Sequence, residues 1–130
     1  MPNLPKQPKP QDRRLIRQTW CAERTAAREA RAAGDPTGEW HHLERAHILS
    51  QPLPGAHVRT HVTMLGYGIR QRDRREITGQ LVRLVVAGPG SVFRRYPLGN
   101  TGGANVNAVA PMAIPADLQA VLDGTVTAWT

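Results

Sequence analysis

The chain has 130 residues, of which 40% are hydrophobic, and it carries a formal net charge of +7. A chain of this length supports a single domain with a modest core. No stretch approaches the roughly 20 apolar residues of a membrane-spanning helix, and the N-terminus has no apolar run of the kind that a signal peptide needs. We therefore expect a cytoplasmic protein with no membrane partner.

Residues 1–11 are polar and rich in proline, and we expect a disordered arm there. Asp12 is a candidate N-cap for a helix over residues 12–33. Apolar residues recur at helical spacing along one face of this helix, namely Ile16, Trp20, Ala27 and Ala30. Glu23 falls on the same apolar side, which makes it a candidate buried carboxylate.

The run Gly34-Asp-Pro36 predicts a tight turn between two antiparallel helices. Glycine suits the left-handed position after a helix, aspartate suits an N-cap, and proline suits the first helical residue. The second helix, expected over residues 36–50, places Glu44 and His47 on its apolar stripe. A carboxylate taken out of water needs a partner, so this stripe predicts a polar constellation inside the core.

The third expected helix, over residues 56–70, carries His57 and His61 one turn apart. Residues three or four apart in an α-helix project from the same side, so such a pair can close on one metal ion. Glu44 and His47 form another pair of this kind. The two pairs are separated by a short, proline-containing break, which predicts that they come close together.

A fourth helix, expected over residues 73–87, begins with the pair Asp73 and Glu76. An aspartate followed three residues later by a glutamate is similar to a capping box, in which both side chains bond backbone amides and no metal is needed. We favour a cap for Asp73 and leave Glu76 open between a cap and a ligand. Four apolar residues predict the core face of this helix, namely Ile77, Leu81, Leu84 and Val85.

Residues 88–130 differ in character, because prolines and a glycine-rich run alternate with apolar residues. We expect an ordered coil that packs on the bundle, and then a short helix over residues 118–123 that Gly124 ends. The predicted fold class is all-α. It is roughly a four-helix bundle over residues 12–87, with an ordered, Gly/Pro-rich C-terminal coil and a short final helix.

Several long phrases of the chain resemble one family. They are His42-Leu-Glu-Arg-Ala-His-Ile-Leu-Ser-Gln51, His57-Val-Arg-Thr-His61, Arg72-Asp-Arg-Arg-Glu-Ile-Thr-Gly-Gln80, Gly99-Asn-Thr-Gly-Gly-Ala-Asn-Val106 and Pro111-Met-Ala-Ile-Pro-Ala-Asp-Leu118. The chain is similar, over about residues 12–120, to a bacterial family of small proteins catalogued as domain of unknown function 3703. The resemblance implies that these residues matter, including Glu23 in the first helix, but it brings no assigned activity.

The paired residues define a candidate metal centre. Its candidate ligands are Glu23, Glu44, His47, His57, His61, Asp73 and Glu76. Imidazole and carboxylate donors suit a divalent transition metal such as iron, manganese or zinc, at a mononuclear or dinuclear site. Dinuclear bundles use two inward-pointing Glu-x-x-His pairs, whereas this chain has one clear pair of that kind.

The sequence leaves the role of this centre open. A metal with open coordination positions would act on a small-molecule substrate, as in a metal-dependent oxidoreductase or hydrolase. A fully coordinated ion would serve folding, sensing or storage. Without a metal, His47 and His61 would bond Glu23 and Glu44 in a purely structural polar core.

The excess of arginine suggests an alternative of another class. Arginines gather along the first helix and at the junction of the third and fourth helices, where they could bind phosphate groups or acidic proteins. The alternative is therefore a non-enzymatic basic binding module for nucleic acid or an acidic protein partner. Nucleic acid is not favoured, because only 5% of the residues are aromatic and no DNA-reading element is evident. A homodimer is compatible with so small a core.

Overall fold

The computed structural model describes part of the chain, namely residues 9–92, 102–104 and 112–124. Within helices, the side chains of residues 10, 11 and 86–92 are left out of the description. Residues 1–8 of the expected N-terminal arm, which was residues 1–11, and most of the glycine-rich run lie outside the described residues.

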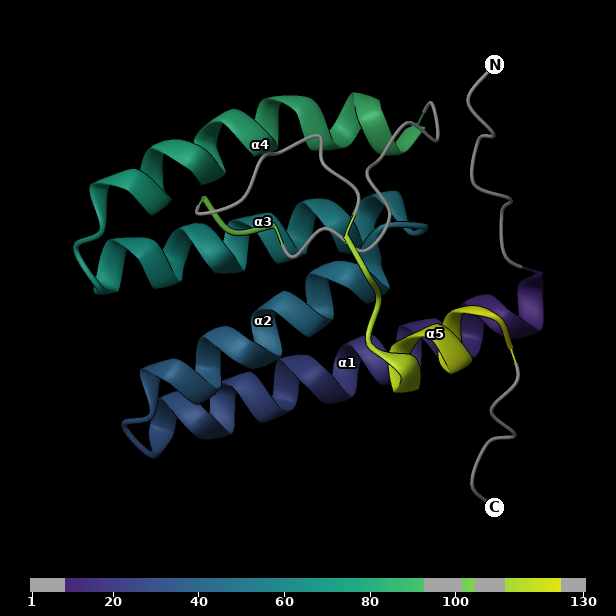
Figure 1. Cartoon of the computed structure of the whole chain (residues 1–130). Helices are drawn as coiled ribbons and strands as arrows, with labels where there is room; N and C mark the ends of the chain where they lie inside the picture. Colours follow the sequence, from purple (N-terminus) through teal and green to yellow (C-terminus); the bar gives the residue numbers. More distant parts are fainter. Residues whose placement is uncertain (1–8, 93–101, 105–111, 125–130) are drawn as a thin grey trace.

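The described residues form five α-helices and no strand, which confirms the all-α fold class (Figure 1). The helices are α1 (Pro10–Ala32), α2 (Pro36–Ser50), α3 (Pro54–Arg70), α4 (Arg74–Val92) and the short α5 (Ala116–Leu122). None of them combines the length and the apolar character that crossing a lipid bilayer would require.

Proline and glycine set the helix boundaries. Gly34 adopts a φ of +72°, and the Asp35 side chain accepts a hydrogen bond of 2.9 Å from the Gly38 N–H, which confirms the predicted turn. The structure corrects the predicted start of α1. Lys9, not Asp12, occupies the N-cap position, because Pro10 already has the φ that the first helical position requires and so begins the helix earlier.

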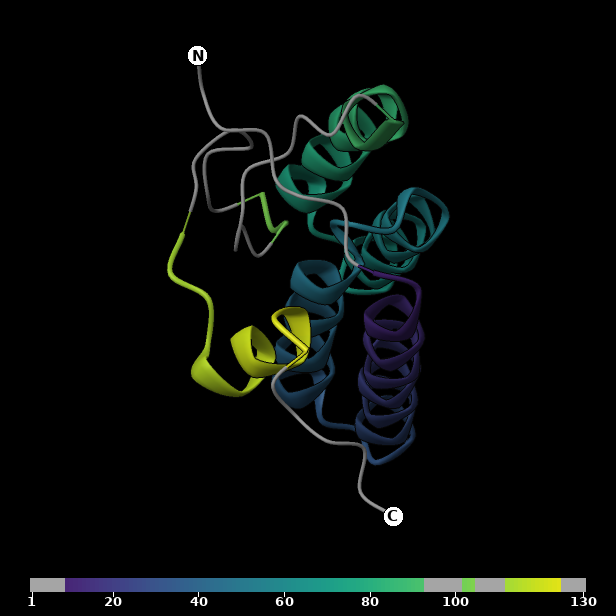
Figure 2. The same cartoon turned by 90° about the vertical axis from the view of Figure 1, so that its right-hand side faces the viewer.

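The four long helices form two antiparallel hairpins, α1–α2 and α3–α4 (Figure 1). The hairpins meet where α2 lies against α3, and α5 packs on α1 and α2 at one end, as Figure 2 shows from the side. Among the helices that the structure describes, α4 makes close backbone contacts with α3 alone. This arrangement brings the C-terminal end of α2 beside the first turns of α3.

Apolar side chains fill the space between α1, α2, α5 and the start of α3. The larger of two clusters includes Ile16, Trp20 and Leu49, each at most 2% exposed, together with Leu118 of α5. A smaller cluster joins Ala27, Leu43 and Met64 near the other end. Thus the periodicity of apolar residues in α1 correctly predicted which face of that helix is buried.

The predicted core face of α4 is only partly correct, because Ile77 and Leu84 are half-buried but the other two residues are exposed. Leu81 is 51% exposed and Val85 is 77% exposed, whereas Glu76 and Gln80 are 7% and 0% exposed. The reason is that α4 lies on α3 with its polar side turned inward, where side-chain hydrogen bonds satisfy the buried polar groups. Leu81 and Val85 of the apolar stripe are therefore left exposed.

The fourth helix also extends past its predicted end at residue 87 and continues to Val92. It passes through Gly88 and Pro89, which lie in the segment that was expected to be coil. An interior proline removes one backbone hydrogen bond and its ring crowds the carbonyl four residues earlier, so the helix continues through Pro89 at a cost in stability. In the C-terminal part, α5 begins at Ala116 and ends at Leu122 before Gly124, whose φ is +68°.

Candidate metal centre

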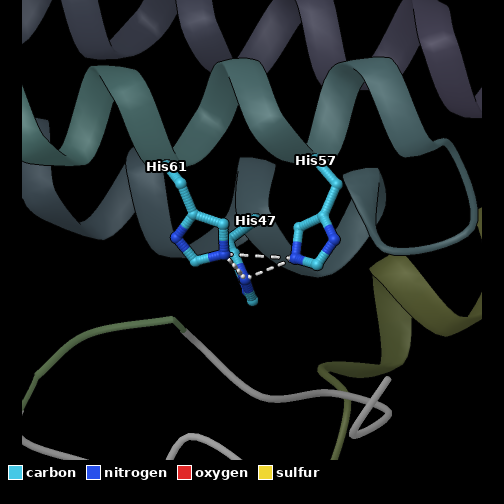
Figure 3. A group of neighbouring side chains, drawn as sticks. All are labelled: His47, His57 and His61. Atoms are coloured by element: carbon cyan, nitrogen blue, oxygen red, sulfur yellow. Dashed lines mark hydrogen bonds between the residues drawn. The ribbon is translucent and has the colours of Figure 1, made fainter. Parts of the chain in front are cut away.

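Three buried histidines converge at the point where α2 meets α3. His57 and His61 project from α3, and His47 reaches the same point from α2 (Figure 3). Their Nε2 atoms lie 3.0 Å apart for His57 and His47, 3.1 Å for His47 and His61, and 3.2 Å for His61 and His57. The three side chains are 5% exposed or less.

Local structure explains the convergence. His57 and His61 are one helical turn apart, so both rings leave the same side of α3. His47 lies in the last turn of α2, and only residues 51–53 separate that helix from α3. The short connection therefore holds the end of one helix beside the first turns of the next.

The spacing of the nitrogens fits one transition-metal ion. A zinc–nitrogen bond is about 2.0–2.1 Å long, so two nitrogens on one ion are about 3.3 Å apart at a tetrahedral angle and about 2.9 Å apart at a right angle. The three separations of 3.0, 3.1 and 3.2 Å fall between these values. The protein thus already holds these donors at positions from which they could bind one ion together.

Hydrogen bonds alone cannot account for all three short distances between these Nε2 atoms. In the plane of its ring, each imidazole nitrogen offers either one hydrogen or one lone pair, so each Nε2 can satisfy one neighbour. Three mutual contacts among three such atoms cannot all be hydrogen bonds. A single cation bound to all three nitrogens would accept a lone pair from every one of them.

Burial also keeps two of the rings neutral. Removal from water, together with the smaller effect of the neighbouring His61, lowers the pKa of His57 to about 3. Burial likewise lowers the pKa of His61, although the hydrogen bond to Gln80 opposes this effect and the charge of Arg83 adds to it. A neutral imidazole is the form that binds a metal.

The other predicted ligands lie outside this group. Among the described residues, the cluster of His, Cys, Asp and Glu side chains able to hold one ion consists of the three histidines. Glu23 accepts instead from His42 Nδ1 at 2.7 Å and from Arg45 Nε at 2.8 Å. Glu44 is half-buried on α2 and is not part of the cluster.

The pair at the start of α4 also takes other roles. The Asp73 carboxylate accepts a hydrogen bond of 3.0 Å from the Glu76 N–H, the geometry of a helix cap. The buried Glu76 carboxylate accepts from the Gln80 side chain at 2.6 Å and from the Ala104 N–H at 3.0 Å. Both carboxylates therefore have hydrogen-bonding roles of their own in the structure.

Two residues beside the cluster were not identified as site residues from the sequence. Gln80 is completely buried and lies 2.7 Å from His61 Nδ1 through its Oε1 atom. Gly102 lies against His47, since a Cβ atom built on it would be 2.6 Å from His47 Cδ2 and 2.9 Å from Nε2. The only sequence signal for Gln80 was its position one turn after Glu76, and Gly102 was hidden in a glycine-rich run.

Comparison with known proteins adds a family but no activity. Residues 14–122 match a family model described as "Protein of unknown function (DUF3703)". Neither the curated proteins nor the solved structures include a match to the chain.

Proposed function

Since the chain belongs to the DUF3703 family, whose function is unknown, we propose from its geometry that it is a metalloprotein that binds one divalent transition-metal ion. The ligands would be the Nε2 atoms of His47, His57 and His61. The observation that carries this proposal is their mutual separation of 3.0–3.2 Å inside the protein.

The donor set favours zinc or iron over manganese. Imidazole suits zinc and iron, whereas manganese prefers carboxylate, carbonyl and water oxygens. The three converging side chains carry no negative charge when neutral, so an ion bound there would keep most of its charge of +2. A site of this kind would attract a negatively charged or strongly polar ligand.

Three protein ligands are fewer than the four that a structural zinc site usually has. In the described part of the chain, this count leaves coordination positions for water or a small-molecule substrate, and the proposal therefore extends to catalysis. When bound, zinc or iron would supply a Lewis acid that lowers the pKa of bound water. Zinc would favour hydrolysis, whereas iron would favour oxidation and reduction.

The decisive experiment is elemental analysis of the purified protein, followed by titration of the metal-free protein with Zn²⁺ and Fe²⁺. We expect about one equivalent of metal per chain. The variants His47→Ala, His57→Ala and His61→Ala should each lose it. His41→Ala is the matched control, because His41 lies on α2 but is exposed. Circular dichroism would verify that each variant is folded.

A wild-type protein that is folded, contains no metal and takes up none would overturn this proposal. The role of the ion can be separated with Co²⁺ as a spectroscopic probe. A cobalt spectrum that changes on addition of azide would show an open coordination position. An unchanged spectrum would indicate full coordination by the protein and would refute the catalytic part of the proposal.

One observation favours a second function, the binding of phosphate groups on a nucleic acid. The Arg24 guanidinium lies 4.6 Å from the centre of the Trp20 ring, and its buried Nε atom has no hydrogen-bond partner among the described residues. Burial, then Arg28 and then Arg59 lower the pKa of Arg24, so like charges lie close together there.

Such a group of arginines would bind phosphates with an affinity that falls steeply as salt is added. A gel-shift assay should then show binding that is lost in a variant with Arg24, Arg28 and Arg59 replaced by Ala. The His41→Ala variant should bind like the wild type. Binding that survives the arginine replacements would contradict this second proposal.

A further inference from the structure

A chain of hydrogen bonds connects the histidine cluster to α4. His61 Nδ1 lies 2.7 Å from Gln80 Oε1, and Gln80 Nε2 donates to Glu76 Oε1 at 2.6 Å. The same Gln80 nitrogen donates to the Gly102 carbonyl at 2.7 Å. Gln80 and Glu76 are one turn apart and both are buried, so the connection is shielded from water.

The partners of Gln80 fix the orientation of its amide. Its nitrogen faces two acceptors, a carboxylate oxygen and a carbonyl oxygen, so its own oxygen has to be the atom that faces His61. Only an N–H on His61 Nδ1 can donate to that oxygen. In the neutral ring, this leaves the lone pair on Nε2, the atom that points at His47 and His57.

The same two side chains also hold the segment Gly102–Ala104. Gln80 binds its first residue through the Gly102 carbonyl, and Glu76 binds its last residue through the Ala104 N–H. Gly102, with a φ of +84°, then lies so close to the His47 ring that no side chain fits between them. One segment of backbone therefore contacts one histidine and is bonded to the side chain that orients another.

We propose that Gln80 and Glu76 are positioning residues that couple metal binding by the histidines to the docking of Gly102–Ala104. This inference rests on the proposed metal site. Gln80 holds His61 in the tautomer that can bind a metal, and it does so while bonded to Gly102. Glu76 anchors both the Gln80 amide and Ala104.

Coupling of this kind is reciprocal. If docking of Gly102–Ala104 strengthens metal binding by some factor, metal binding must strengthen docking by the same factor. Loss of a hydrogen-bond partner behind a metal-bound histidine typically weakens metal affinity about 10- to 100-fold. The same replacement should therefore reduce the effect of metal on the segment.

Two measurements on the same proteins test the proposal. The first is the dissociation constant for Zn²⁺, and the second is amide hydrogen exchange at Ala104, whose N–H is bonded to Glu76 only when the segment is docked. Both are made with and without Zn²⁺. The variants are Gln80→Met, which keeps the length of the side chain, and Glu76→Leu.

We expect Gln80→Met and Glu76→Leu to weaken Zn²⁺ binding about 10- to 100-fold. In the wild type Zn²⁺ should slow exchange at Ala104, and in Gln80→Met this slowing should largely disappear. Glu76→Gln keeps an oxygen that can accept a hydrogen bond and should restore most of the affinity. Gln18→Met, on the exposed side of α1, is the matched control and should change neither quantity.

The inference is overturned if the wild type binds Zn²⁺ and Gln80→Met binds it equally well. It is also overturned if Zn²⁺ leaves exchange at Ala104 unchanged in the wild type. A purely structural role would lower the stability of the variants but leave the affinity of the folded protein for Zn²⁺ unchanged. A wild type that binds no metal refutes the proposed function itself, which is a different outcome.

Discussion

The two hairpins of this protein differ in the balance of apolar and polar side chains that they bury. The α1–α2 hairpin is closed by apolar residues such as Ile16 and Leu49, neither of which is exposed. In the α3–α4 hairpin, His61 and Gln80 are buried in a hydrogen-bonded network, while Leu81 is half exposed. Burial of apolar side chains therefore stabilises the first hairpin. The second depends on polar groups that need matched partners.

Replacement of one leucine in each hairpin should give the largest difference. Leu49→Ala removes a side chain that is 0% exposed, so we expect a loss of about 2 to 5 kcal/mol in the free energy of unfolding. Leu81→Ala, on α4, is the same change at a side chain that is 51% exposed, and it should cost less than about 1 kcal/mol. Urea denaturation measures both. Equal losses would mean that the two hairpins do not differ in this way.

Acid should destabilise the protein through His57, a buried histidine of the α3–α4 hairpin. The folded-state pKa of His57 is about 3, below the usual value of 6.5, so between these values the unfolded chain binds more protons than the folded one. Stability should therefore fall as the pH falls below about 6.5, by about 2 kcal/mol between pH 6.5 and 4.5. The measurement is urea denaturation of the metal-free protein across this range.

The variant His57→Gln is the comparison for that pH profile. It has no imidazole to titrate at this position, so its stability should fall less steeply over the same range. NMR of the His57 ring would test the cause directly, because the ring should remain neutral at pH 5. A ring that titrates near pH 6.5 would contradict the prediction.

The ion pair between Glu39 and Arg70 tests the joint between the two hairpins. Two bonds, of 2.5 and 3.1 Å, tie the end of α3 to the buried Glu39 carboxylate on α2. Arg70 is one of the arginines that the sequence gathers at the junction of the third and fourth helices. Arg70→Ala should cost about 1 to 2 kcal/mol in thermal or urea unfolding, because it leaves that carboxylate without this partner. Arg70→Lys keeps the charge and should cost less. A larger loss of stability in Arg70→Lys than in Arg70→Ala would contradict this prediction.

Substitutions at two glycines would distinguish the effect of backbone strain from the effect of contact with the histidines. Gly102 and Gly34 have φ values of +84° and +72°, so replacing either by alanine should cost about 1 kcal/mol of stability. Only Gly102→Ala would also push against His47, because nothing lies within 4 Å of a Cβ at Gly34. We therefore expect weaker Zn²⁺ binding in Gly102→Ala alone, measured by titration. Equal affinities in the two variants would show that Gly102 does not shape the site.

The candidate site could be predicted only in part from the sequence. His57 and His61 share a helix face by spacing alone, and His47 was placed on a buried stripe by the same reasoning. Helical spacing also placed Glu44 and Glu76 among the candidate ligands. It gives the face of one helix, however, and not the distance between side chains on different helices. Glu76 instead bonds Gln80 and Ala104, which are partners that spacing cannot reveal.

The local chemistry of the chain was enough to predict the five helical segments and where the first turn lies. Gly34 and Asp35 end one helix and begin the next through contacts within a few residues. The tertiary structure alone decided which side of α4 is buried. Its apolar stripe predicted one answer, but docking on α3 turned Gln80 toward His61 and left Leu81 half exposed. The physical reason is that a polar helix face can be buried when partners from other segments satisfy its hydrogen bonds, and those partners are set by the fold.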